Sequence, residues 1–127
     1  MRIIGHGIDI VEIARIQRLL DMPNSEWTRA AFTSKERELA DAPPADTRYF
    51  AARYAAKEAV GKALGTGISG EIAWMDIEIL RQATGEPAVS LTHAALESAN
   101  ELGVTRWIIS ISHSGTYAVA SAIAVSE

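Results

Sequence analysis

Two carboxylates of this 127-residue chain stand in surroundings where a charge needs a partner. Asp9 lies inside the apolar run from Gly7 to Val11, and Glu58 lies in a segment rich in small residues that begins at Arg53. Burying an unpaired charge costs free energy, so a carboxylate in such a segment needs a partner, which a bound cation shared by the two carboxylates would supply. Mg²⁺ prefers oxygen ligands and commonly takes one or two carboxylates together with substrate phosphates. The pair therefore suggests a metal site for a phosphate-bearing substrate.

Each carboxylate also has a simpler interpretation. Asp9 could cap a helix that follows the strand, and Glu58 could form an exposed i,i+4 pair with Lys62, worth only about 0.2–0.5 kcal/mol. The turn Gly65-Thr66-Gly67 adds backbone N–H groups and a hydroxyl near the same helix end, a combination suited to phosphate. No i,i+4 metal-ligand spacing occurs among the three histidines, which argues against a zinc hydrolase. Spacing alone leaves these alternatives open.

The composition restricts the class of protein. A chain of this length is expected to form one domain over residues 1–127, and 48% hydrophobic residues can fill its core. The absence of cysteine excludes disulfides and thiolate metal sites. A net charge of −4 argues against general binding to nucleic acid. No apolar run approaches the roughly 18 residues of a membrane span, and the N-terminus lacks a signal-peptide pattern. The expectation is a cytoplasmic protein without membrane partners.

Hydrophobic periodicity and turn residues predict the elements that position these side chains. Strands are expected over 3–11, 72–80, 88–92, 106–112 and 117–125, and helices over 12–20, 25–32, 33–42, 46 or 47 to near 65, and 92–102. Gly5 and Gly7 would allow another backbone to approach the first strand closely. Thr33 and Glu36 have the spacing of a capping box. The fold class is α+β, a single domain with an antiparallel sheet packed on one long helix and shorter helices.

Two segments together resemble a known family. The run from Gly7 to Ile13, followed by Arg15, resembles the first motif of the bacterial holo-acyl-carrier-protein synthases, which are small 4′-phosphopantetheinyl transferases. The run Arg53–Ala59, continued by Lys62–Gly67, resembles their second motif. The separation of the motifs, the chain length and the closing hairpin are also similar, so the resemblance covers essentially the whole chain.

A third segment imitates part of the second motif. Phe32–Glu36 repeats its aromatic-x-x-Lys-Glu core but lacks the Ala-x-x-Lys that should follow. Glu36 is therefore predicted to begin a helix rather than to bind a metal.

The resemblance implies an activity. Members of the family move the 4′-phosphopantetheine group of coenzyme A onto a serine of apo-acyl carrier protein, release adenosine 3′,5′-bisphosphate and thereby support fatty acid biosynthesis. It implies that Asp9 and Glu58 hold Mg²⁺ and that Lys62 stabilises phosphate charge. Glu58, or a water on the metal, would take the serine proton. Glu12, Asp76 or water would complete the metal shell.

The resemblance also implies binding residues and an assembly. Coenzyme A is expected to contact Arg53, Lys62, Gly65, Thr66, Gly85, Pro87 and His113. His113 could act from a neighbouring subunit, or it could be an ordinary hairpin residue. The family's small members are homotrimers with active sites shared between subunits. Arg15 and Arg18, on the polar side of the first helix, would dock the acidic carrier protein, although without the family a solvated helix face would be the favoured explanation.

Two other functions compete with the transferase. One is a non-catalytic carrier- or nucleotide-binding module on the same scaffold, against which the presence of both carboxylates and Lys62 argues. The other is a different Mg²⁺-dependent phosphate enzyme, which would be expected to carry a Walker loop or a denser acidic cluster.

Overall fold

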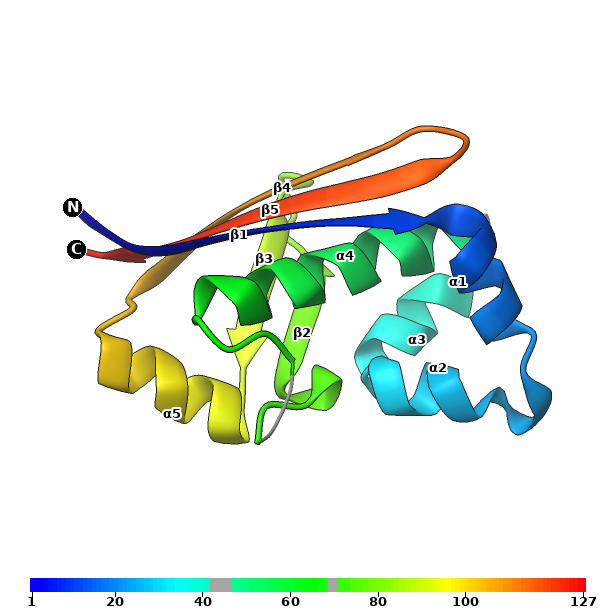
Figure 1. Ribbon diagram of the computed structural model, residues 1–127, viewed down its shortest axis with the longest axis horizontal. Helices are drawn as coiled ribbons and strands as arrows, with labels where there is room; N and C mark the ends of the chain where they lie inside the picture. The colour runs from blue at the N-terminus through cyan, green and yellow to red at the C-terminus, as the bar shows by residue number, and fades with distance from the viewer. Residues whose placement is uncertain (42–46, 69–70) are drawn as a thin grey trace.

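A three-stranded antiparallel sheet lies along one long helix in the computed structural model, which describes residues 1–41, 47–68 and 71–127 (Figure 1). The strands are β1 (Arg2–Glu12), β2 (Ile77–Arg81), β3 (Pro87–Leu91), β4 (Arg106–His113) and β5 (Tyr117–Ser126). The helices are α1 (Ile13–Leu20), α2 (Glu26–Ala31), α3 (Ser34–Asp41), α4 (Thr47–Ala63) and α5 (His93–Leu102), with short 3₁₀ turns η1 (Pro23–Ser25) and η2 (Trp74–Asp76). The α+β class is confirmed.

The two sheets are both antiparallel. The order of the larger one is β1-β5-β4, so that the first strand pairs with the last, with Asp9 opposite Ala120. The smaller sheet is the hairpin β2-β3, whose turn contains Gly85 at φ +95°, a left-handed conformation that suits glycine. The limits of β3, β4 and β5 and the end of β2 were predicted to within one residue. The predicted helix limits at 42 and 46 lie outside the described residues.

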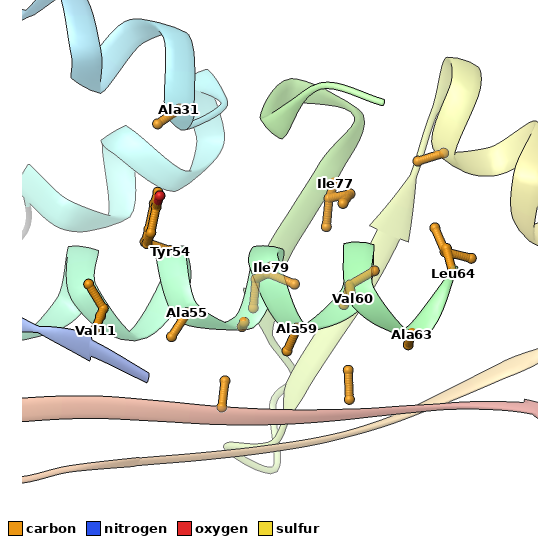
Figure 2. Close-up of a cluster of buried hydrophobic side chains, with 14 of the residues drawn as sticks. Val11, Ala31, Tyr54, Ala55, Ala59, Val60, Ala63, Leu64, Ile77 and Ile79 are labelled. Carbon is orange, nitrogen blue, oxygen red and sulfur yellow. The ribbon is translucent and has the colours of Figure 1, made fainter. Parts of the chain in front are cut away.

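Small residues allow α4 to lie directly against β1. A Cβ added at Gly7 would stand 2.0 Å from the carbonyl oxygen of Ala59, and one added at Gly5 would stand 2.0 Å from that of Ala63. The close approach predicted for these glycines is therefore confirmed. Figure 2 shows Ala59 and Ala63 on the side of α4 toward the sheet, and Val60 on the side toward Ile77 of β2. Because alternate residues of a strand share a face, Asp9 lies on the face of β1 that meets α4.

The strand predicted from residue 72 begins only at Ile77, so this boundary was wrong. Its first part forms the 3₁₀ turn η2 because the Asp76 carboxylate accepts the N–H of Ala73 at 3.2 Å, and the Asp76 N–H donates to the Ala73 carbonyl at 3.0 Å. These bonds turn the chain before the hairpin begins. They also fix the position of Trp74, the first residue of the turn.

The predicted capping box at the start of α3 is confirmed. The Thr33 N–H donates to Glu36 Oε1 at 2.8 Å, and the Glu36 N–H donates to Thr33 Oγ1 at 3.2 Å. In the described part of the chain, no helix is long and apolar enough to cross a membrane.

Candidate active site

The two motifs meet at an ion pair between β1 and α4. Lys62 Nζ lies 3.1 Å from Asp9 Oδ1, and it also donates a hydrogen bond to the carbonyl of Ile8 at 2.9 Å. The Asp9 side chain is 16% exposed and that of Lys62 is 48% exposed, so the pair borders the surface. Asp9 thus has a cationic partner in the described structure. Helix α1 begins after Glu12 without a side-chain cap, so Asp9 does not cap it.

Glu58 lies one helical turn before Lys62 on α4 and is half-buried. Its Oε1 accepts a hydrogen bond from the indole Nε1 of Trp74 at 2.9 Å. Because Lys62 reaches Asp9 and Glu58 reaches Trp74, the geometry gives each side chain a partner outside the helix, unlike the simple i,i+4 pair that spacing allowed.

The pKa of Tyr54 is affected by both motif carboxylates. Its pKa is raised to about 12, first by burial, then by the negative charge of Glu58 and a hydrogen bond with it. Arg15 acts in the lowering direction and Asp9 in the raising one. The Tyr54 hydroxyl therefore stays protonated near neutral pH, and the two motif carboxylates and Arg15 lie in one electrostatic neighbourhood.

The donor set fits a hard cation that also binds phosphate. Asp9 and Glu58 offer carboxylate oxygens from two rigid elements, and one or two carboxylates plus phosphate oxygens is a common Mg²⁺ arrangement. No group of three or more His, Cys, Asp or Glu suited to a metal occurs within 1–41, 47–68 and 71–127. The other suggested ligands have different partners: Glu12 lies 3.8 Å from Arg18, and Asp76 caps η2.

A second region is a basic pocket of about 560 Å³, a size typical of small-molecule sites. Its lining residues are Arg48, Tyr49, Ala52, Arg53, Arg81, Gly85, Pro87, Ile109, Ser110, Ile111 and His113. Four of the residues predicted for coenzyme A are among them, and the lining contains no carboxylate among the residues that the structure describes. The sequence analysis did not predict Arg48 or Arg81 as site residues. Both flank predicted phosphate contacts along the chain, and this position could have identified them.

Arg53 is the most constrained cation of this pocket. It is 5% exposed, its guanidinium lies 4.4 Å from the centroid of the Tyr49 ring, and its Nε is buried without a hydrogen-bond partner in the described structure. Burial lowers the pKa of Arg53; the phenol of Tyr49 acts in the opposite direction, and the charge of Arg81 lowers the pKa further. Buried polar groups are normally satisfied, so the Arg53 Nε is an exception among the described residues, as is the Nε of Arg37.

The residues predicted for coenzyme A form two groups rather than one. Lys62, Gly65 and Thr66 lie at the end of α4, and Thr66 lines a separate cleft of about 390 Å³. Arg53 belongs to the basic pocket, nine positions before Lys62. Nine helical residues span about 14 Å along the axis and half a turn around it. The two groups therefore face opposite sides of the same helix.

Comparisons with known proteins match nearly the whole chain to one family. The family model for the 4′-phosphopantetheinyl transferase superfamily matches residues 5–122. The holo-[acyl-carrier-protein] synthase of Natranaerobius thermophilus is 46% identical over 98% of this chain and 99% of its own, and that of Geotalea daltonii is 41% identical over 93% and 94%.

Solved structures show the same fold. The holo-[acyl-carrier-protein] synthase of Neisseria meningitidis aligns with a TM-score of 0.88 and 33% identity, covering 98% of this chain and 99% of its own. A holo-(acyl-carrier-protein) synthase of Bacillus anthracis in complex with CoA (3′,5′-ADP) aligns with a TM-score of 0.81 and 35% identity, covering 98% of each chain. This chain therefore belongs to the 4′-phosphopantetheinyl transferase superfamily.

Proposed function

We propose that the protein transfers the 4′-phosphopantetheine group of coenzyme A to a serine of an apo-acyl carrier protein. The observation that carries the proposal is the 3.1 Å ion pair between Asp9 and Lys62, which joins the two motifs, with Glu58 one turn away. Relatives named holo-[acyl-carrier-protein] synthase and a neighbour bound to CoA support it. The non-catalytic alternative would not need this group of charged residues. The reaction would take place in the cytoplasm and support fatty acid biosynthesis.

The reaction requires that the charge of the pyrophosphate be neutralised and that the attacking serine be aligned with the phosphorus. The serine oxygen bonds to the phosphorus nearer the pantetheine, the bond from that phosphorus to the bridging pyrophosphate oxygen breaks, and the serine proton is removed. The products are the modified carrier and adenosine 3′,5′-bisphosphate. Asp9 and Glu58 would hold Mg²⁺, which when bound offsets the charge of the pyrophosphate. The Lys62 ammonium, on the same edge, would stabilise charge on the phosphate oxygens.

We place the nucleotide phosphates partly in the basic pocket. Arg53 and His113, together with Gly85 and Pro87 of the adjacent turn, were expected to contact coenzyme A, and Arg81 adds a further charge. An anion in this pocket would be stabilised by the positive charges of Arg53 and Arg81.

One coenzyme A would then have to bridge two faces of α4, unless the two groups come from different subunits. We therefore propose a homotrimer in which one subunit supplies Asp9, Glu58 and Lys62 and its neighbour supplies the basic pocket. The sheet face opposite α4 supports assembly: Ile8 and Ile10 are 58% and 62% exposed on β1, and no described element covers this face (Figure 1). Large exposed apolar patches commonly mark interaction sites.

The carrier protein would approach along α1. Arg15 and Arg18 are exposed on this helix, and Arg15 also influences Tyr54 beside the motif carboxylates. Exposed ion pairs contribute under about 1 kcal/mol each, so the two arginines would set orientation and association rate more than affinity.

A mass measurement tests the proposed reaction. Incubating the protein with coenzyme A, Mg²⁺ and apo-acyl carrier protein should add one phosphopantetheine to the carrier, with a protein of known synthase activity as positive control. An unmodified carrier under conditions where the control works would contradict the proposal. Omission of the divalent cation should abolish the gain, because the two carboxylates would then repel the pyrophosphate.

Subunit mixing tests the shared site. Lys62→Ala and Arg81→Glu should each strongly reduce transfer, since one removes a phosphate contact and the other reverses a charge in the basic pocket. Both side chains are exposed, so folding should be retained. Co-refolding equal amounts should restore about a quarter of the sites by random assortment, if each site combines residues of two subunits in a symmetric assembly. Activity no higher than that of the separate variants would place each site within one chain.

A further inference from the structure

Trp74 is held rigidly beside Glu58. Its indole Nε1 lies 2.9 Å from Glu58 Oε1, and its ring centroid lies 5.9 Å from that of Tyr54, which in turn lies 5.6 Å from the Trp27 ring. The backbone on which it stands is fixed by the carboxylate of Asp76. Backbone and ring contacts therefore both restrict the indole to this position.

An indole N–H can only donate a hydrogen bond. It therefore always presents a donor to Oε1, whereas a hydroxyl or an amide could turn and present an acceptor instead. A hydrogen bond to a charged acceptor is stronger than one between neutral groups. The bond restrains the Glu58 side chain, which is also hydrogen-bonded to Tyr54, and leaves the second carboxylate oxygen free of the indole donor.

We propose that Trp74 is a positioning residue for Glu58, which it holds in the orientation that binds the divalent cation. The inference rests on the proposed function, because it takes Glu58 as a metal ligand. It assigns a role to a residue outside both sequence motifs. Donors that orient ligating carboxylates typically contribute 10- to 100-fold to metal affinity or activity.

Nuclear magnetic resonance tests the contact without any turnover. The chain has three tryptophans, so a ¹⁵N–¹H spectrum should show three indole signals, and the one missing in Trp74→Phe belongs to Trp74. Glu58→Gln should shift that signal and leave those of Trp27 and Trp107 in place. Should Trp74→Phe fail to fold, Trp27→Phe and Trp107→Phe identify the other two signals, and an unmoved Trp74 signal in Glu58→Gln would overturn the proposal.

Measuring the affinity for Mg²⁺ tests whether the contact of Trp74 with Glu58 affects cation binding. With coenzyme A present and the carrier omitted, calorimetry should show an apparent Mg²⁺ dissociation constant about 10-fold or more higher in Trp74→Phe than in the wild-type protein. Trp27→Phe is the matched control, since it removes an indole from the same aromatic group but no donor to Glu58. An unchanged constant in Trp74→Phe, or an equal rise in Trp27→Phe, would overturn the inference. A wild-type protein that binds Mg²⁺ but never modifies the carrier would instead contradict the proposed function.

Discussion

Replacing Glu36 by alanine is expected to lower the free energy of unfolding by about 3–5 kcal/mol, because it leaves a buried lysine without its counter-charge. Lys57 Nζ lies 2.5 Å from Glu36 Oε1, and neither side chain is exposed. Glu36 Oε2 also accepts the N–H of Ile79 at 2.8 Å, and Lys57 donates to the carbonyl of Ala31 at 2.6 Å. Burial lowers the pKa of Lys57 and the charge of Glu36 opposes that shift. The pair thus links four elements.

Urea unfolding followed by circular dichroism, at one protein concentration, measures this loss. Glu38→Ala is the matched control, since it removes an exposed carboxylate from the same helix. Adding Lys57→Met to Glu36→Ala should recover part of the stability, because removing both charges is less destabilising than leaving one buried charge without its partner. Equal midpoints for the Glu36 and Glu38 variants, or a double variant no more stable than Glu36→Ala, would contradict the role given to the pair.

The same residue marks how far the sequence could predict the fold. The capping box links Thr33 to Glu36 over three positions, and such local patterns can be found in the sequence. The contact with Lys57 joins residues 21 positions apart and depends on how α3 packs against α4. Lys57 and Glu58 are neighbours in the motif, yet about 100° of helix rotation separates them, so one points into the core and the other toward the site.

The candidate site likewise combines contacts that the sequence could predict with contacts that it could not. A bound cation shared with Glu58 was predicted as the partner of Asp9 and stays a prediction; the partner that the structure shows is Lys62, 53 positions away. The glycines that bring β1 onto α4 made this approach foreseeable. Trp74 was not foreseeable, because apolar alternation predicted a strand there and only the Asp76 cap turns the chain. Arg81 joins the basic pocket through packing of separate elements, which periodicity does not encode.

Asp9→Ala and Glu58→Ala are each expected to reduce transfer by about 100-fold or more, since each would remove a proposed ligand of the cation that offsets the charge of the reacting phosphates. Initial rates of carrier mass gain measure the effect. Neither side chain belongs to the hydrophobic core, so the unfolding midpoint should change little. Glu12→Ala is the control, an exposed carboxylate at the end of the same strand that lies 3.8 Å from Arg18. Full activity in either alanine variant would remove the two-carboxylate site.

Milder variants separate the two roles that Glu58 could have. Asp9→Asn weakens cation binding alone, so raising the Mg²⁺ concentration should restore part of its activity by mass action. Glu58→Gln keeps the shape of the side chain and an oxygen that can accept the Trp74 N–H, but it cannot take a proton from serine. Recovery of Glu58→Gln in parallel with Asp9→Asn assigns Glu58 to cation binding alone. Persistent inactivity of Glu58→Gln, beside recovery of Asp9→Asn, assigns it the serine proton as well.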